Sequence, residues 1–394
     1  MSFRRIEDAP VGVRALVRVD FNVPMADGRV SDDTRLRAAL PTIRALQAKR
    51  AKIALLAHFG RPKGKRAPAL SLGPLAEPLS KLLGAPAAFA ADCIGAQAGA
   101  AIAALQPGGV ALLENVRFHP GEEKNDLEFA KALAANFDIY VNDAFSAAHR
   151  AHASTEGIAH LLPAYAGKQM ERELDALEAA LGRPRRPVLG IVGGAKVSTK
   201  LDLLKSLIAK LDRLAIGGGM ANTFLYAQGH DIGASLAERE MAETARAIIA
   251  AAEGKCELLL PVDVVVAKEV KPGAASRICG LGGVSAADKI LDAGPETVAR
   301  LLKAMDDSAT LIWNGPLGLF EIAPFDQATV EAARHAARLV KTGKLVAVAG
   351  GGDTVAALNH AGAAGDFTFV STAGGAFLEW MEGKALPGVE ALKK

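Results

Sequence analysis

The chain has 394 residues, of which half are hydrophobic and 23% are charged, and its formal net charge is +3. One hydrophobic core seldom organises so long a chain, so two globular domains of about 150 to 200 residues each are expected. The balance of apolar and charged residues excludes a disordered protein, and the small net charge excludes the strongly basic surface of a nucleic-acid-binding protein.

The first part of the chain alternates short apolar runs with helical patterns. Continuously apolar runs separated by helices are typical of buried parallel strands joined by right-handed crossovers. The predicted strands are 15–19, 53–57, 110–114 and 139–143, and the clearest helices are 34–51 and 126–137.

Residues 167–187 read as a charged amphipathic helix that ends at Gly182, before two prolines. A helix is stiffer than a Gly/Ser linker, so this segment is predicted to connect two domains and to transmit a hinge motion between them.

The second part of the chain repeats the alternation of strands and helices. Its predicted strands are 188–192, 214–218, 257–261, 310–314, 345–349 and 367–371, and its clearest helices are 200–211, 237–252 and 326–343. The two parts together predict an α/β protein with two doubly wound, Rossmann-like, three-layer domains with parallel sheets, joined by a helical hinge.

Polar residues follow many of these strands at the point where the strand ends. Because an open α/β sheet binds ligands at this edge, each domain is predicted to present a polar rim. The first rim offers side chains that suit phosphate or carboxylate oxygens, namely Arg35, His58, Arg61, Arg117 and Arg150. The second rim offers glycine runs, which allow the backbone to approach a nucleotide phosphate closely.

The glycine runs match neither common nucleotide-binding fingerprint. A dinucleotide fingerprint needs Gly or Ala at its sixth position, which is Val355 in one run and Asn222 in the other. The P-loop pattern is also missing from "VGGAKVSTK". Lys196 and Lys200 of that stretch are expected one helical turn apart, and two cations at a helix start favour an anionic ligand.

Several motifs together resemble one family. They are "RVDFNVP", "HFGRP", "ENVRF", "NDAFSAAHRAHAST", "GGAKVSTK", "IGGGMANTF", "WNGPLGLFE", "GGGDT" and "STAGGAFLE", and they run from about residue 20 to residue 384. Their order and spacing are similar to those of phosphoglycerate kinases. Ala373 is a departure, because the family commonly has a third glycine there. The resemblance implies reversible transfer of the acyl phosphate of 1,3-bisphosphoglycerate to Mg-ADP, giving 3-phosphoglycerate and ATP.

The resemblance also implies a role for individual residues. The glycerate would be held by Asp20, Asn22, Arg35, His58, Arg61, Arg117 and Arg150. The nucleotide would be held by Lys196, Lys200, Gly217, Asn314, Glu321, Gly350, Gly351, Gly352, Asp353 and Thr354. Asp353 would bind magnesium and Glu321 the ribose, while Arg35, Lys196, Gly351 and Gly374 are the expected catalytic residues. No general base is expected, because the attacking oxygen is already ionised in both directions.

Under this resemblance, residues 1–167 form the phosphoglycerate-binding domain, and a segment at about 377–394 packs back on it. Residues 168–186 form the hinge and 187–376 the nucleotide-binding domain. The expected protein is a hinge-bending monomer that does not bind nucleic acid. No export signal or membrane span is seen in the sequence, so a cytoplasmic location is expected.

Two other functions share parts of this pattern. A nicotinamide dehydrogenase would share the α/β layers, but it needs the fingerprint that is missing here. A two-lobed, non-catalytic protein that binds phosphometabolites or nucleotides would share the hinge, although it would not need a lysine pair, a metal-binding carboxylate and an arginine rim together.

Some residues also have a simpler interpretation. His58 and Trp313 are candidates for the core, His149 and His152 for structural roles, and Asp353 for a helix N-cap. Glu114 and Asp143 are expected to orient the rim arginines. The three cysteines, Cys93, Cys256 and Cys279, lack C-x-x-C spacing and are expected to be packing residues.

Overall fold

A computed structural model describes residues 3–26 and 28–393. The chain divides into two compact units. Unit 1 consists of Met1–Leu174 together with Ala385–Lys394, and unit 2 consists of Asp175–Lys384. The first boundary falls inside the helix that was expected to connect two domains.

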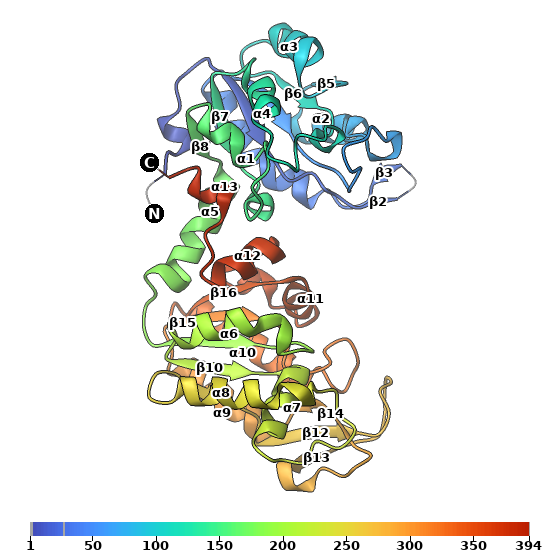
Figure 1. The fold of residues 1–394 in the computed structure, drawn as a ribbon, viewed down its shortest axis with the longest axis vertical. Helices are drawn as coiled ribbons and strands as arrows, with labels where there is room; N and C mark the ends of the chain where they lie inside the picture. The colour runs from blue at the N-terminus through green and yellow to red at the C-terminus, as the bar shows by residue number, and fades with distance from the viewer. Residues whose placement is uncertain (1–2, 27, 394) are drawn as a thin grey trace. The chain divides into compact units, whose positions relative to one another are not determined.

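Unit 1 contains a sheet of six parallel strands in the order β5-β6-β4-β1-β7-β8 (Figure 1). Its strands are β1 (Arg14–Arg18), β4 (Lys52–Leu56), β5 (Ala87–Ala90), β6 (Val110–Leu113), β7 (Ile139–Asn142) and β8 (Ala164–Ala166), with a small hairpin of β2 (Met25–Ala26) and β3 (Arg29–Val30). Its helices are α1 (Thr34–Ala48), α2 (Ala76–Leu83), α3 (Gly95–Ala104), α4 (Leu127–Ala134), the first part of α5 (Lys168–Leu177) and α13 (Pro387–Glu390).

Both faces of this sheet are buried. Val17 of β1 packs with Leu36 and Ile43 of α1, whereas its neighbour Leu16 packs on the opposite face with Ile102 of α3. Successive side chains of a strand point to opposite faces, so the continuously apolar run of β1 supplies two cores and the unit has three layers.

Unit 2 contains a second sheet of six parallel strands, in the order β11-β10-β9-β15-β16-β17, and an antiparallel sheet in the order β13-β12-β14. Its strands are β9 (Val188–Val192), β10 (Arg213–Ile216), β11 (Glu257–Leu259), β12 (Asp263–Ala267), β13 (Ser276–Gly280), β14 (Lys289–Ala293), β15 (Thr310–Asn314), β16 (Val346–Gly350) and β17 (Phe369–Ser371). Its helices are the end of α5, α6 (Leu201–Ile208), α7 (Gly218–Ala227), α8 (Ala242–Ala252), α9 (Pro295–Asp306), α10 (Gln327–Lys341), α11 (Gly352–His360) and α12 (Gly374–Met381).

The two parallel sheets confirm the predicted α/β class. The sequence analysis missed β5 and β8 because both are alanine-rich and short, and alanine has a low β propensity. It also missed the antiparallel sheet. Strand β13 is largely exposed, so it lacks the continuous apolar run that identifies a strand buried on both faces.

Candidate functional site

The first group of candidate residues lies at the carboxyl edge of the unit 1 sheet. Arg18 of β1 is in register with Leu56 of β4 and Asn142 of β7, so the segments that follow these strands leave the sheet at one edge. Asp20 comes two residues after Arg18, and His58 comes two residues after Leu56. The prediction of a polar rim at this edge is therefore supported by the strand register.

Asp20 organises one part of the rim. Its Oδ2 atom accepts a hydrogen bond of 2.7 Å from Arg35 Nη1 and one of 2.5 Å from Ser146 Oγ, and its Oδ1 accepts one of 3.1 Å from the Asn22 backbone. Asn22 Oδ1 accepts in turn from the Gly60 backbone N–H at 3.0 Å. These bonds connect the loops after β1 and β4 to helix α1.

The remaining rim arginines differ in exposure. Arg117 is buried in a short 3-10 helix after β6, donates from Nη1 to the Gly60 carbonyl oxygen at 2.9 Å and lies 3.4 Å from Glu123. Arg61 and Arg150 are exposed, and Arg150 Nε donates to the His149 ring at 3.1 Å. Besides Arg35, the rim thus has one fixed arginine, Arg117, and two that are accessible to solvent, Arg61 and Arg150.

His58 lies among these positive charges. Burial lowers the pKa of His58, and the nearby Arg18, Arg117 and Arg150 lower it further, so the imidazole is neutral. Its Nδ1 atom is 3.0 Å from Arg18 Nη2. Because a guanidinium only donates, Nδ1 accepts and the proton of the ring is on Nε2. The interpretation of His58 as a simple packing residue does not account for this cluster of cations.

A buried network behind His58 was missed by the sequence analysis. Arg18 is fully buried and donates from Nε to Ser154 Oγ at 2.9 Å, and Ser154 Oγ donates to Glu122 Oε1 at 2.6 Å. Glu122 also lies 3.6 Å from His152, so His152 has the structural position expected for it. The signal in the sequence was the charged Arg18 inside an otherwise apolar strand, because a buried charge requires partners.

The expectation that Glu114 and Asp143 orient the arginines is wrong. The Glu114 carboxylate accepts from Ser71 Oγ at 2.7 Å and from two backbone N–H groups. Asp143 Oδ1 accepts from the backbone N–H groups of Gln169 and Met170, at 2.8 and 3.2 Å, in the first turn of α5. Both carboxylates satisfy backbone donors of the fold.

The second group of candidates lies at the carboxyl edge of the parallel sheet of unit 2. Lys200 Nζ donates to the Gly193 carbonyl oxygen and to Asn314 Oδ1, both at 2.6 Å. Asn314 Nδ2 donates to the Gly350 carbonyl oxygen at 2.8 Å, and Thr354 Oγ1 accepts from the backbone of Gly315 at 2.7 Å. The ends of β9, β15 and β16 are therefore joined by side chains that the sequence analysis assigned to the nucleotide.

The expected helical pairing of Lys196 with Lys200 is wrong. Helix α6 begins only at Leu201, and Lys196 is an exposed residue of the preceding loop, before a 3-10 turn at Ser198–Lys200. The glycines before Lys196 delay the start of the helix. Burial lowers the pKa of Lys200 to about 8, while the nearby Asp353 acts in the opposite direction. Lys200 is thus a partly buried cation, and Lys196 is a solvent-exposed one.

Two helix N-termini lie side by side in unit 2. A Cβ atom added to Gly374, the first residue of α12, would be 4.0 Å from the backbone nitrogen of Gly352, the first residue of α11. Unpaired N–H groups at a helix start attract anions, so two adjacent starts are suited to phosphate groups. Ala373 precedes α12 with a φ of −93°, which a non-glycine residue adopts readily, so its extra methyl group is accommodated.

Gly351 requires glycine for two reasons. Its φ is +102°, and a Cβ atom there would lie 2.7 Å from Asn314 Nδ2. Gly217, which precedes α7, is similarly enclosed, because a Cβ atom would lie 2.7 Å from the backbone of Leu317. Two of the candidate nucleotide-binding glycines therefore permit close packing of loops at the sheet edge.

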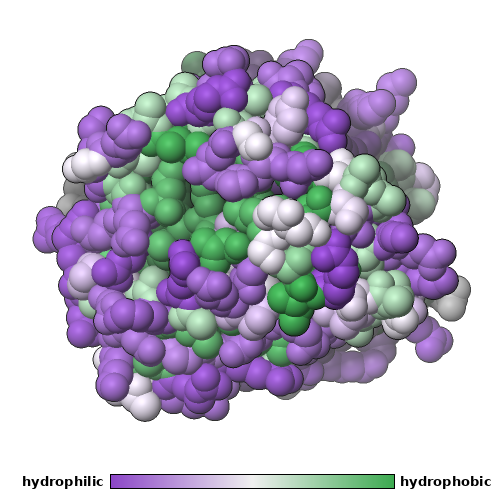
Figure 2. Space-filling model, turned by 90° about the horizontal axis from the view of Figure 1, so that it is seen from below, coloured by the Kyte–Doolittle hydropathy of each residue, from purple (hydrophilic) through white to green (hydrophobic). Residues whose placement is uncertain are grey.

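A cavity of about 710 Å³ lies in unit 2, with Glu321 and Asp353 among its lining residues. Much of its lining is apolar and includes Leu236 and Val270, which are also among the exposed large hydrophobic residues. Figure 2 shows a hydrophobic area framed by hydrophilic residues on the face that points down in Figure 1. A cavity with an apolar lining and few carboxylates is suited to a flat organic ligand that also carries polar groups.

Asp353 is the second residue of α11, and the residue at the N-cap position is Gly351, so the N-cap interpretation of Asp353 is wrong. Its carboxylate is exposed in the first turn, where a negative charge is favoured by the helix dipole. A single carboxylate beside two helix starts suited to phosphate groups fits Mg²⁺, which is commonly held by one or two carboxylates and the phosphate oxygens of a substrate. Trp313, in contrast, is a buried core residue, as expected.

Comparisons with known proteins identify relatives over the whole chain. The phosphoglycerate kinase family matches residues 6–384. A phosphoglycerate kinase of Caulobacter vibrioides (strain NA1000 / CB15N) is 70% identical over 395 residues, which is 100% of both chains. The structure is similar to that of phosphoglycerate kinase from Coxiella burnetii, with a TM-score of 0.94, 42% identity and 99% of each chain covered. It is also similar to that of the enzyme from Pyrococcus horikoshii OT3, with a TM-score of 0.80, 31% identity, and 99% of this chain and 98% of that chain covered.

Within the part of the chain that the structure describes, no helix combines the length and the hydrophobicity needed to cross a lipid bilayer.

Proposed function

Because the chain belongs to the phosphoglycerate kinase family and is a glycolytic kinase, we propose that unit 1 binds the phosphoglycerate and unit 2 binds the nucleotide. The observation that carries this assignment is the difference between the two sheet edges. Unit 1 gathers arginines around a neutral His58, whereas unit 2 has a cavity beside two adjacent helix N-termini. The family assignment favours the kinase over a two-lobed, non-catalytic binding protein.

In unit 1, the phosphate and carboxylate of the glycerate are the anions that the rim requires. Arg117 has a fixed guanidinium, and the exposed Arg61 and Arg150 close on the ligand from solvent. His58 offers its Nε2–H as a neutral donor, because Arg18 occupies Nδ1. Asp20 holds the start of α1, which carries Arg35, and Asn22 holds the loop that carries His58. The lone pairs of Asp20 and the exposed amide of Asn22 are available to hydroxyl groups of the glycerate.

In unit 2, the apolar lining of the cavity receives the adenine base, and Glu321 accepts hydrogen bonds from the ribose. The phosphates lie against the starts of α11 and α12, where Gly351 and Gly352 leave the backbone accessible, and Gly350 allows the end of β16 to pack closely against Phe377 of α12. Lys196 and Lys200 supply positive charge, and Asn314 and Thr354 keep the strand ends in place. Gly217, just before α7, permits the close approach of the loop that carries Leu317.

Phosphoryl transfer to an oxygen that is already ionised needs no general base. It needs in-line alignment and positive charge around the equatorial oxygens of the transferring group. We assign that charge to Arg35 and Lys196, together with backbone N–H groups at Gly351 and Gly374. Asp353 would hold Mg²⁺, which neutralises phosphate charge when it is bound.

The two reactants bind to different units, so the reaction requires the units to bring them together. We propose that the connector at 168–186 is the hinge for this motion. The enzyme is further proposed to act as a monomer in the cytoplasm, as expected for an enzyme of glycolysis. Small-angle scattering tests closure, because the radius of gyration should fall only when both substrates are present. An unchanged radius would contradict closure.

The activity itself is tested by phosphorus NMR of the protein with Mg-ATP, 3-phosphoglycerate and a trap for the acyl phosphate. Resonances of ADP and of trapped product are expected to grow with time. Both resonances should grow far more slowly with the Arg35→Ala variant. This comparison shows whether the activity belongs to the protein and not to a contaminant. No ADP from the wild-type protein over the same period would exclude the proposed reaction.

A further inference from the structure

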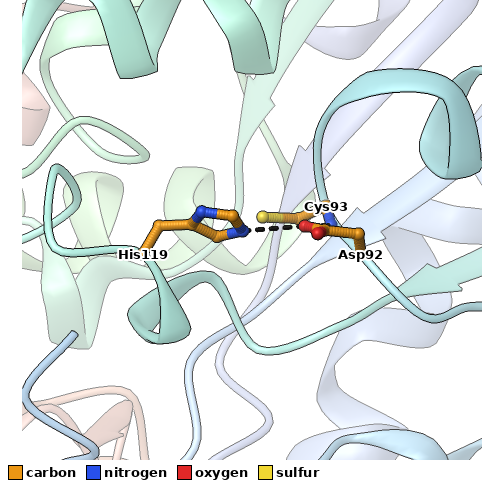
Figure 3. Close-up of side chains that lie close together, drawn as sticks. All are labelled: Asp92, Cys93 and His119. Atoms are coloured by element: carbon orange, nitrogen blue, oxygen red, sulfur yellow. Dashed lines mark hydrogen bonds and ion pairs between the residues drawn. The ribbon is translucent and has the colours of Figure 1, made fainter. Parts of the chain in front are cut away.

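A second cluster of chemically reactive side chains lies at the edge of the unit 1 sheet. Asp92 and Cys93 follow β5, and His119 follows the 3-10 helix Val116–Phe118 after β6. Among the described residues, these three form one group of potential metal ligands whose ligand atoms all lie within 4.8 Å of one another. Figure 3 shows the imidazole of His119 directed toward both the Cys93 sulfur and the Asp92 carboxylate.

The three side chains are held in this arrangement by their surroundings. Asp92 Oδ1 accepts from His119 Nε2 at 2.7 Å and from the Cys93 backbone N–H at 2.7 Å. The His119 ring stacks on Phe129 with centroids 5.0 Å apart. Arg66 Nη2 lies 3.6 Å from the other oxygen of Asp92 and donates to the Ala91 carbonyl oxygen at 2.8 Å. The orientation of the ligand atoms is therefore determined by packing and hydrogen bonds.

We propose that Asp92, Cys93 and His119 form a binding site for a zinc ion, separate from the magnesium bound with the nucleotide. A thiolate, an imidazole and a carboxylate are the three ligand types that zinc takes in proteins, and a thiolate disfavours magnesium and calcium. Three protein ligands leave a fourth, tetrahedral position for water. Asp92 Oδ1 and His119 Nε2 must separate by roughly half an ångström to reach the spacing of tetrahedral ligands.

Metal binding requires a defined movement of protons. The Cys93 thiol loses its proton to solvent as the sulfur–zinc bond forms, and His119 binds zinc through the lone pair of Nε2 while Nδ1 carries the ring proton. Zinc binding stabilises the thiolate form of the Cys93 side chain, so binding is coupled to release of the thiol proton.

The position of the cluster gives the ion a structural role. It would join the segment after β5 to the segment after β6, which are adjacent parallel strands with Ala90 in register with Leu113. His119 is two residues from Arg117, which we assign to the glycerate. Bound zinc is therefore expected to stabilise unit 1 on the side of the rim where Arg117 lies.

The test is titration of the nucleotide-free, full-length protein with Zn²⁺ against a chromogenic chelator, in excess Mg²⁺. One zinc per chain is expected. Cys93→Ser and His119→Gln should each weaken binding roughly tenfold or more. The matched control is Cys256→Ser, which removes another buried thiol and should leave the affinity unchanged. Asp353→Asn should also leave it unchanged, since Asp353 belongs to unit 2.

Cobalt provides a second measurement that identifies the ligands. Co²⁺ bound at this site should give a thiolate-to-cobalt charge-transfer band and the intense visible absorption of four-coordinate cobalt. Both should be lost in Cys93→Ser and retained in Cys256→Ser. Circular dichroism and thermal melting establish that each variant is folded, and His119→Gln carries the test if Cys93→Ser does not fold. Equal zinc affinity in Cys93→Ser, His119→Gln and Cys256→Ser, or a cobalt complex without the thiolate band, would overturn the proposal.

Discussion

Lys200 Nζ lies 2.6 Å from Asn314 Oδ1, so a partly buried ammonium group is fixed at the end of β15. The amide of Asn314 also donates to Gly350, the first glycine of the run before α11. Burial lowers the pKa of Lys200 to about 8. A lysine attracts phosphates only while it is protonated. The affinity of the nucleotide-free enzyme for Mg-ATP is therefore expected to fall as the pH rises through about 8, and titration calorimetry at several pH values measures this.

Lys200→Met is the control for that experiment. It should bind Mg-ATP more weakly at every pH and should lack the change near pH 8, because it has no proton to lose. An unaltered pH profile in this variant would show that another group titrates.

Arg35 is expected to act in the chemical step. Its side chain is 38% exposed and its partner Asp20 is 17% exposed, so loss of this ion pair should cost at most about 1 kcal/mol of stability. Removal of a charge that faces the transition state should cost about 3 to 4 kcal/mol, or several hundredfold in kcat. Steady-state kinetics of Arg35→Ala test this. Near-normal turnover in Arg35→Ala, with activity abolished in Arg117→Ala, would contradict the assignment.

Asp353→Asn separates the metal-binding role from a structural one. Asp353 is exposed and is not the N-cap residue, so the free energy of unfolding should change by no more than about 0.5 kcal/mol. The magnesium concentration needed for half-maximal activity should rise. Asp307→Asn, at the end of α9, is the matched exposed control and should leave the magnesium requirement unchanged. The same magnesium dependence in both variants would argue against a metal-binding Asp353.

Asp143 makes the stability of unit 1 depend on pH. Burial raises its pKa to about 7, from an ordinary value of 3.8. The folded state then binds the proton more tightly than the unfolded state, so the contribution of Asp143 is fully present below about pH 4 and is lost as the pH rises through 7. Asp143→Asn removes this titration and keeps an oxygen for the backbone of Gln169.

Chemical denaturation of both proteins at about pH 5 and about pH 8 checks this sign. The unfolding free energy of Asp143→Asn minus that of the wild type should be larger at the higher pH than at the lower one. Only at the higher pH does the wild type carry a buried charge at this position, and the variant never does. A difference in unfolding free energy that is the same at both pH values would refute the prediction.

Gly351→Ala and Gly352→Ala form a pair in which adjacent glycines should behave differently. Gly351 has a φ of +102° and no room for a Cβ atom, whereas a Cβ atom on Gly352 would meet nothing within 4 Å. Thermal or urea unfolding should show a loss of about 1 to 3 kcal/mol for Gly351→Ala and little change for Gly352→Ala. Equal losses would mean that the steric argument is wrong.

The parts of the fold that were predicted correctly share a local cause. Strands such as β6 and β9 carry no polar side chain because both faces of the sheet are covered, and this pattern is visible in four or five residues of sequence. Among the missed strands, β5 and β8 are short and alanine-rich, and β13 is largely exposed, so these three lack the pattern. Strand β12 has an apolar run, residues 264–267, that was not assigned to a strand.

The candidate site shows the same division. Asp20 and His58 were found because the end of a parallel strand marks the ligand-binding edge. The Arg18–Ser154–Glu122 network was not, because its members are separated by more than one hundred residues, or by 32 in the case of Ser154 and Glu122. Lys196 was misplaced because the periodic spacing did not show that the helix starts five residues later, at Leu201.

Unit 1 is assembled from both ends of the chain, with a consequence for synthesis on the ribosome. Gly388 donates to the Ala148 carbonyl oxygen at 2.8 Å, its own carbonyl accepts from Asn142 at 3.4 Å, and Phe3 forms a bridge with Lys393. These contacts do not exist until Gly388 and Lys393 have left the ribosomal tunnel. Unit 2, which is continuous in sequence, can complete its fold first, and unit 1 is complete only after the segment that begins at Ala385 has been synthesised.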